Sequence, residues 1–247
     1  MSHRGFVAVP RMASQQQRGY AMSVLNKLKH AALALLALAL MSAGTANAIN
    51  PPVTTSADTL ILGDSVFALS GDIHQYLQED LNETITSRAR SGCQMLGGNI
   101  ICSRRYAVPE QYANAPKTGI NTLIFNGGGN DIQFSNCRPS LSACMPLLQN
   151  LEDEIAELAQ QMQADGIENI VFLGYYNAVG DAEELREINE YSMDLKARTY
   201  PGLGITFVDV RQAFQGNEAR YIANDGIHPT AEGSRVLADL ILEHLAD

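Results

Sequence analysis

The stretch TLILGDSV, residues 59–66, begins with a short apolar run and passes into a glycine-containing turn. The run Thr59–Leu62 followed by Gly63 is typical of a buried strand that enters a turn. From Val66 to Leu81 the pattern is typical of a helix, although Gly71 interrupts it. The stretch therefore predicts a strand, a turn and a helix in succession, the unit from which α/β folds are built.

The same alternation continues to the C-terminus. Further strands are expected at residues 122–126, 169–175 and 205–210, with a weaker one at 83–90. Helices are expected at residues 145–164, 182–198 and 231–245, the first of them from apolar residues that recur with a 3.6-residue period. Near-continuous apolar strands that alternate with helices predict an α/β fold with a mainly parallel sheet, covered by helices on both faces.

The N-terminal segment has the features of a signal peptide. Residues 22–48 combine a basic start, an apolar run too short to span a bilayer comfortably, and the small-residue pattern of Ala46–Ala48. We expect Met22 to be the natural start and cleavage to follow Ala48, so that residues 1–48 are leader and residues 49–247 form one domain. An uncleaved membrane anchor is the alternative. The domain is therefore expected in the periplasm or outside the cell, without integral membrane association after cleavage.

The charge of the domain excludes some partners. Removing the leader takes away five basic residues and no acidic one, so the net charge changes from −10 to −15. A body this acidic repels phosphate backbones and anionic membrane surfaces, so nucleic acid is not an expected partner. The acidic run 152–157 (EDEIAE) is expected to be a solvated helix face. A monomer is expected.

The four cysteines all lie in the exported part of the chain. An even number of cysteines in an oxidising compartment predicts two disulfides, for which three connectivities are possible. We favour the short-range pairs Cys93–Cys102 and Cys137–Cys144, because each closes a small loop between regular elements. A metal site is the competing interpretation, but CxxC spacing and nearby histidines are missing.

Three polar clusters lie where a parallel sheet gathers its functional groups, beyond the carboxyl ends of the strands. Gly63–Ser65 follows the first expected strand, Gly127–Asp131 follows a later one, and Asp225–His228 lies in the loop before the last helix. Sequence-distant polar groups are therefore expected to converge on one edge of the sheet.

Two of these clusters contain the groups needed for nucleophilic catalysis. A serine hydroxyl such as that of Ser65 attacks only when a neutral imidazole accepts its proton, and the imidazole needs a partner for its other nitrogen. Asp225, three residues before His228, can be that partner. The plainer alternatives are that Ser65 caps the following helix and that the Asp225 turn caps the last one. The other histidines of the domain, His74 and His244, are expected at the surface.

Donors for a developing negative charge are also present. Asn130 follows three glycines after an apolar strand, and its side-chain amide can donate to an oxyanion. Gly92 can supply a backbone N–H in the same way, although a plain turn glycine is the simpler interpretation. A nucleotide-phosphate loop is an alternative for NGGGND, but the GxGxxG spacing and the P-loop lysine are missing.

Four blocks of the sequence together resemble those of one enzyme family. ADTLILGDS (57–65), RSGCQ (90–94), GGND (128–131) and DGIHP (225–229) resemble the blocks of SGNH hydrolases, also called GDSL esterases/lipases, in the family's order. The nearest likeness is to the periplasmic multifunctional thioesterase/lysophospholipase/arylesterase group. The resemblance covers residues 57–246 and implies a flavodoxin-like three-layer α/β/α sandwich, the SGNH hydrolase fold.

The resemblance also implies a role for each site residue. Ser65 is the implied nucleophile, His228 the base and Asp225 the acid that orients it. The implied oxyanion hole consists of the N–H groups of Ser65 and Gly92 and the side chain of Asn130. No metal or organic cofactor is expected, because hydroxyl, imidazole and oxyanion donors suffice.

The function expected from these residues is that of an exported serine hydrolase, which cleaves acyl esters or thioesters, small or lipid-like, through an acyl-enzyme. A carbohydrate O-acetyl esterase and a non-catalytic acyl- or glycan-binding module on the same fold are the alternatives. The sequence departs from the family at Val66, where the signature has leucine, and at residues 93–118 and 135–144, which match no family block. Within the first segment, Arg104-Arg105 contacts an anionic head group or polymer, or is a solvated basic pair.

Overall fold

A computed structural model of the chain describes residues 58–70, 72–138 and 140–245. The expected leader, with Met22 and the cleavage site after Ala48, lies outside the described residues. Among the helices that are described, none is both long and apolar enough to cross a membrane.

The centre of the domain is a five-stranded sheet in which all neighbouring strands are parallel. Its strands are β1 (Thr59–Leu62), β2 (Thr86–Ser87), β3 (Thr122–Phe125), β4 (Asn169–Leu173) and β5 (Thr206–Val208), in the order β2-β1-β3-β4-β5. The predicted parallel α/β fold is confirmed. The strand order reverses between β1 and β3, and open α/β sheets bind ligands beyond the strand ends at such a point.

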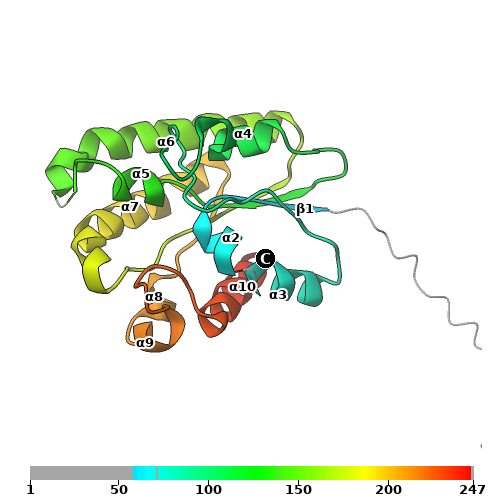
Figure 1. Ribbon diagram of the computed structural model, residues 1–247. Coiled ribbons are helices and arrows are strands. Elements are labelled where there is room, and N and C mark those ends of the chain that lie inside the picture. Colours follow the sequence, from blue (N-terminus) through cyan, green and yellow to red (C-terminus); the bar gives the residue numbers. More distant parts are fainter. Residues whose placement is uncertain (1–57, 71, 139, 246–247) are drawn as a thin grey trace, which may run out of the picture. The chain divides into compact units, whose positions relative to one another are not determined.

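Helices cover both faces of the sheet and complete three layers. They are α2 (Ser65–Ser70), α3 (Asp72–Leu81), α4 (Val108–Ala113), α5 (Gly129–Gln133), α6 (Leu141–Ala164), α7 (Arg186–Thr199), α8 (Arg211–Phe214), α9 (Glu218–Tyr221) and α10 (Ala231–Leu245), with 3₁₀ turns at Arg104–Tyr106, Gly180–Leu185 and Tyr200–Leu203. Figure 1 shows α4 and α6 on one side of the sheet and α3 and α10 on the other.

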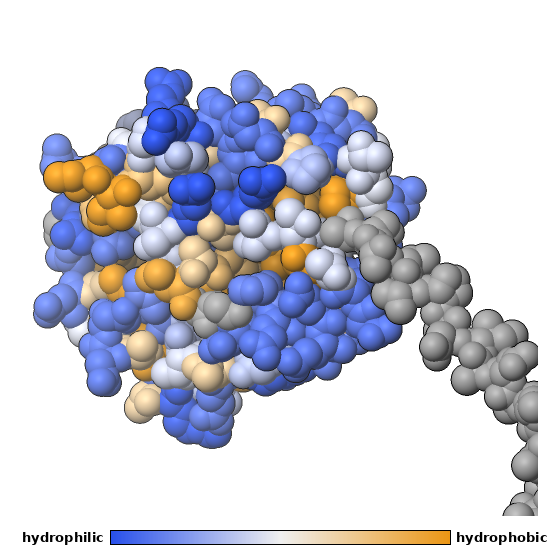
Figure 2. All heavy atoms as spheres, turned by 45° about the vertical axis from the view of Figure 1, so that its right-hand side comes forward, coloured by the Kyte–Doolittle hydropathy of each residue, from blue (hydrophilic) through white to orange (hydrophobic). Residues whose placement is uncertain are grey.

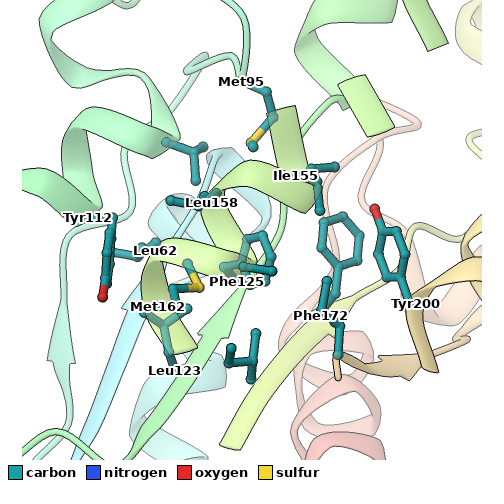
Figure 3. Packing of buried hydrophobic residues seen from close by; sticks show 14 of the residues in the cluster. Leu62, Met95, Tyr112, Leu123, Phe125, Ile155, Leu158, Met162, Phe172 and Tyr200 are labelled. Atoms are coloured by element: carbon teal, nitrogen blue, oxygen red, sulfur yellow. The ribbon is translucent and has the colours of Figure 1, made fainter. Parts of the chain in front are cut away.

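The alternation of side chains along each strand fills two hydrophobic clusters. Leu60 and Leu62 of β1 pack in the cluster under α4 and α6, whereas Ile61 packs in the cluster under α3 and α10. Figure 3 shows the first cluster, in which Phe125 and Phe172 from neighbouring strands meet edge to face at 5.0 Å between ring centroids. Both faces of the sheet are therefore dry, which explains the near-continuous apolar strands. On the face of the molecule that Figure 2 shows, the surface is largely hydrophilic, with apolar residues scattered across its middle.

Several boundaries differ from those expected. The strand expected at 83–90 is only Thr86–Ser87, and the strand expected at 169–175 ends at Leu173, because Tyr175 leaves the sheet and bonds to Asp64 instead. The last strand is likewise shorter than 205–210.

Two helices also begin at other residues than expected. Helix α6 begins at Leu141, four residues early, because the Ser140 side chain caps it and accepts the N–H of Ala143. Helix α7 begins at Arg186, four residues late, because residues 180–185 form a tighter 3₁₀ turn first.

The structure joins the cysteines in the two short-range pairs, Cys93–Cys102 and Cys137–Cys144. The first bond closes a loop after β2, and the second ties the start of α6 to the chain that precedes it. The metal alternative for the cysteines is therefore wrong.

Candidate active site

The turn after β1 presents Ser65 as the first residue of α2. Asp64, directly before it, is the N-cap, since its Oδ1 accepts the N–H of Val66 at 2.9 Å. The alternative in which Ser65 serves only as the cap is therefore wrong. Ser65 is buried, with 9% of its surface exposed, and lines a cavity beside the ends of β1 and β3.

Two buried amide side chains hold this turn. Gln111 on α4 accepts the N–H of Gly63 at 2.8 Å and donates to its carbonyl at 2.9 Å. Asn126, just after β3, accepts the N–H of Asp64 and donates to its Oδ1, both at 3.0 Å. Gly63 has φ +142°, and a Cβ there would lie 1.9 Å from the Asn126 Oδ1, so only glycine fits.

A third contact comes from the end of β4. The hydroxyl of Tyr175 donates to Asp64 Oδ2 at 2.6 Å. Burial raises the pKa of Asp64, against the lowering effect of this hydrogen bond. Burial, together with the charge of Asp64, raises the pKa of Tyr175 well above its ordinary value, so the phenol stays a donor.

The loop before α10 brings Asp225 and His228 together. Asp225 Oδ2 lies 2.6 Å from His228 Nδ1, while its Oδ1 accepts the N–H groups of Ile227 and His228 at 3.0 and 2.9 Å. Partial burial raises the pKa of Asp225, but these hydrogen bonds outweigh it and lower the pKa to about 2. The ionised carboxylate thus holds a proton on Nδ1 and leaves Nε2 as the acceptor.

This loop is not the cap of the last helix. Thr230 fills that role, because its Oγ1 accepts the N–H of Gly233 at 3.1 Å. The hydroxyl of Tyr176 donates to the carbonyl of Ile227 at 2.7 Å, and Gly226 has φ +75° with Val179 O only 2.4 Å from where a Cβ would lie. The contacts with Tyr176 and Val179 therefore fix the position of the loop.

His228 Nε2 is buried and has no hydrogen-bond partner among the described residues. Ser65 and Ile227, the neighbour of His228, line the same cavity. A charge on His228 also opposes the effect of burial on the pKa of Asp64, next to Ser65. No hydrogen bond between Ser65 and His228 is found among the described residues, and catalytic hydrogen bonds are often long or absent before substrate binds.

Hydrogen bonds connect the start of α5, which carries Asn130, to the loop that contains Gly92 and the Cys93–Cys102 disulfide. Asn130, in the first turn of α5, donates from Nδ2 to the carbonyl of Cys93 at 2.9 Å. Asp131 accepts the N–H groups of Met95 and Leu96 at 2.8 and 3.0 Å. Gly92 has φ +74° and is buried. These bonds fix the positions of the Gly92 N–H and the Asn130 amide relative to each other.

The cavity beside Ser65 has a volume of about 100 Å³. Its wall is formed mainly by apolar and aromatic groups that include Leu151, Tyr175 and Met193. Lys196 on α7 lines it as well, with 3% of its side chain exposed, and its Nζ bonds to Glu152 on α6 and, at 3.1 Å, to Ser192 Oγ.

Glu152 was expected on a solvated face, and that expectation is wrong. Its side chain is 12% exposed because it pairs with Lys196, while the neighbouring Asp153 is exposed as expected. Burial lowers the pKa of Lys196, and the charge of Glu152 opposes that effect.

The other two histidines lie apart from this arrangement. His74 on α3 and His244 on α10 are partly exposed, and His244 Nδ1 bonds to the carbonyl of Leu240 at 2.8 Å. Neither lines the cavity beside Ser65.

Sequence reasoning missed the residues that support the site: Gln111, Asn126, Asp131 and Tyr175. Asn126 directly precedes the glycine run and Asp131 lies two residues after it, and polar residues at these places after an apolar strand are a usable signal. Gln111 carried none, because α4 itself was not expected.

A model of the GDSL-like lipase/acylhydrolase family matches residues 61–236. No curated protein matches the sequence significantly. Among solved structures, Axe2, an acetylxylan esterase from Geobacillus stearothermophilus, is similar at TM-score 0.59 and 15% identity, over 79% of this chain and 96% of that one. The lipase Lip_vut3 from a goat rumen metagenome is similar at TM-score 0.55 and 16% identity, over 76% and 97%. At these sequence identities the similarity shows a shared fold.

Proposed function

The chain belongs to the GDSL-like lipase/acylhydrolase family of SGNH hydrolases, and from this we propose that it is an exported serine hydrolase that cleaves short acyl esters or thioesters at Ser65. The observation that carries the proposal is the Asp225–His228 pair, whose acceptor nitrogen Nε2 is buried and has no hydrogen-bond partner among the described residues, while the adjacent Ile227 lines the same cavity as Ser65. A helix cap or a plain turn would not need such a nitrogen.

The reaction proceeds in two steps on this arrangement. Ser65 Oγ attacks the acyl carbon while His228 Nε2 takes its proton, and the proton then passes to the leaving alcohol or thiol as the C–O or C–S bond breaks. Water, deprotonated by His228, releases the acid from the acyl-enzyme. The N–H groups of Ser65 and Gly92 and the amide of Asn130 stabilise the negative charge on the acyl oxygen.

The size of the cavity supports short acyl groups. At about 100 Å³ it is smaller than the engineered cavity of ~150 Å³ that holds benzene, which favours a short acyl group in the enclosed part of the site. The same observation favours a second candidate, an O-acetyl esterase for carbohydrates, which is also the activity in the name of the similar Axe2.

Hydrolysis of chromogenic acyl esters from acetyl to palmitoyl tests the proposal. We expect turnover to be highest between acetyl and butyryl and to be lost in Ser65→Ala, whereas Ser103→Ala, an exposed serine, serves as the control and retains it. Turnover that survives Ser65→Ala would mean that the nucleophile is another residue. Ligand binding without turnover on any ester would favour the binding module.

Export is the second part of the proposal. The two disulfides of the domain support an oxidising compartment. When the full chain is produced in a bacterial host, we expect the mass of the exported protein to correspond to a chain that begins at Ile49. An intact N-terminus in the membrane fraction would instead indicate an uncleaved anchor.

A further inference from the structure

Three arginines surround one half-buried tyrosine beside the candidate active site. Arg88, Arg90 and Arg105 line a hollow of about 310 Å³ together with Tyr106. The guanidinium carbons of Arg90 and Arg105 lie 3.9 and 4.7 Å from the centroid of the Tyr106 ring. Cation–π attraction to the ring holds these two side chains, and no hydrogen bond from their guanidinium groups is found among the described residues.

These arginines differ from most of the other arginines of the domain in their partners. Arg211 pairs with three carboxylates and Arg235 with two. No ion pair to Arg88, Arg90 or Arg105 is found in the described part of the chain. Glu110 lines the same hollow, and no ion pair between it and these arginines is found among the described residues. In a chain of net charge −10, three adjacent unpaired guanidinium groups keep a local positive potential that suits an anion.

The hollow adjoins the nucleophile turn. The N–H of Arg90 donates to the carbonyl of Gly63 at 3.0 Å, and Gln111, which lines the hollow, bonds to the same residue. Arg90 is also two residues before Gly92. An anionic group bound here would therefore lie on the β2 side of Ser65, whereas the acyl cavity lies beside Tyr175 and α7.

We propose that Arg88, Arg90 and Arg105 form an anion-binding subsite that holds a phosphate or carboxylate carried by the alcohol part of the ester. The substrate class is thus an acyl ester of an anionic alcohol. This assignment to the alcohol part rests on the proposed function, whereas the binding of an anion by the three arginines does not.

Direct binding of inorganic phosphate, measured by calorimetry at low ionic strength, tests the subsite without any turnover. We expect millimolar binding that weakens with added salt and falls at least tenfold in Arg88→Gln/Arg105→Gln. Arg104→Gln is the matched control, since this exposed neighbour does not line the hollow, and it should bind phosphate like the unaltered protein. Absent binding, or equal binding by all three proteins, would overturn the proposal.

A pair of matched substrates tests the second step. We expect kcat/KM for an acetylated galacturonate or for an acyl glycerol phosphate to exceed that of its uncharged counterpart, and the ratio to fall tenfold in Arg88→Gln/Arg105→Gln. The substrate pair whose charged member has the higher kcat/KM identifies carboxylate or phosphate as the natural anionic group. Turnover without any preference for the charged substrate would overturn the anion-binding subsite but not the proposed serine hydrolase activity. Phosphate binding without turnover of any ester would overturn the proposed activity but not the subsite.

Discussion

Tyr175 is the residue whose side chain connects the separate parts of the candidate site. Its hydroxyl donates to Asp64 at 2.6 Å and also accepts the N–H of Gly129, at the start of the helix that carries Asn130. We expect Tyr175→Phe to lower the free energy of unfolding by about 1.5–3 kcal/mol, because a buried carboxylate loses a donor. We also expect kcat to fall several-fold, since Ser65 follows Asp64.

Tyr191→Phe is the control for this substitution. Tyr191 packs against the hydrophobic core, and its hydroxyl makes no hydrogen bond in the part of the chain that the structure describes. Urea denaturation and ester hydrolysis on both variants should therefore show losses for Tyr175→Phe alone. Equal effects in the two variants would mean that the loss is not specific to the bond between Tyr175 and Asp64.

The pH dependence of activity follows from Asp225 and His228. Asp225, with a pKa of about 2, stays ionised throughout the range in which enzymes of this kind are assayed. Acidification within that range therefore leaves the carboxylate partner of His228 Nδ1 charged, so the pair is not disrupted from the Asp225 side. We expect Asp225→Asn to lower kcat by roughly 10³–10⁴-fold, because the ring loses the partner of Nδ1.

The contrast between Asp225 and Tyr175 shows what the sequence could predict at this scale. Asp225 and His228 are three residues apart, so their contact is local and was predictable. Tyr175 and Asp64 are 111 residues apart, and they meet only because β1, β3 and β4 are neighbours with the observed register. A phenol at the end of an apolar strand looks like core from sequence alone.

At the scale of elements, the loop closed by Cys93–Cys102 carries Gly92 at its base. Removing this bond by Cys93→Ser/Cys102→Ser is expected to lower the free energy of unfolding by roughly 2.5–3 kcal/mol, from the loop-closure entropy of about ten residues. We expect kcat to fall as well, because Asn130 bonds to the carbonyl of Cys93 and the Gly92 N–H lies next to it.

The second disulfide provides a matched comparison. Cys137–Cys144 closes a loop of similar length at the start of α6 and makes no contact with Gly92. Cys137→Ser/Cys144→Ser should therefore lower stability by a similar amount with a smaller effect on kcat. Thermal unfolding and ester kinetics of the two double variants test this prediction. An equal loss of kcat in both would show that the effect is general and not specific to the loop that carries Gly92.

The ion pair between α6 and α7 is a further element-scale contact. Lys196 is buried and the Glu152 side chain is only 12% exposed where the two helices meet, so removing one partner leaves an uncompensated charge. We expect Lys196→Met to lower the free energy of unfolding by about 3–5 kcal/mol. Adding Glu152→Leu should recover much of this loss, which a double-mutant cycle in urea would measure. If the double variant is no more stable than the single one, the pair is not coupled.

At the scale of the whole molecule, the layered α/β fold was predictable because each central strand is apolar on both faces. Leu60, Ile61 and Leu62 all lie at 0% exposure, and that continuity is visible in the sequence. The short helices α4 and α5 were not, since they are held by tertiary contacts such as Gln111 with Gly63 and not by their own periodicity. The low exposure of Glu152 was likewise not predictable, because it depends on the ion pair with Lys196 on another helix.

The buried carboxyl groups give the whole domain a pH dependence of stability that differs from that of activity. Burial raises the pKa of Asp64 and Asp131, so the folded protein holds these protons more tightly than the unfolded chain, whose value is about 4. Acidification from pH 7 towards pH 4 is therefore expected to increase the free energy of unfolding.

Below about pH 4 the sign reverses. Asp225 and Asp209 have lowered pKa values, because hydrogen bonds to them outweigh burial, so the unfolded chain binds these protons first and stability falls. We thus expect maximal stability near pH 4–5. Urea denaturation across pH 3–8 measures this, and Asp131→Asn should flatten the slope above pH 4. A stability maximum that coincides with the activity maximum would show that the buried carboxyl groups do not control the stability of this domain.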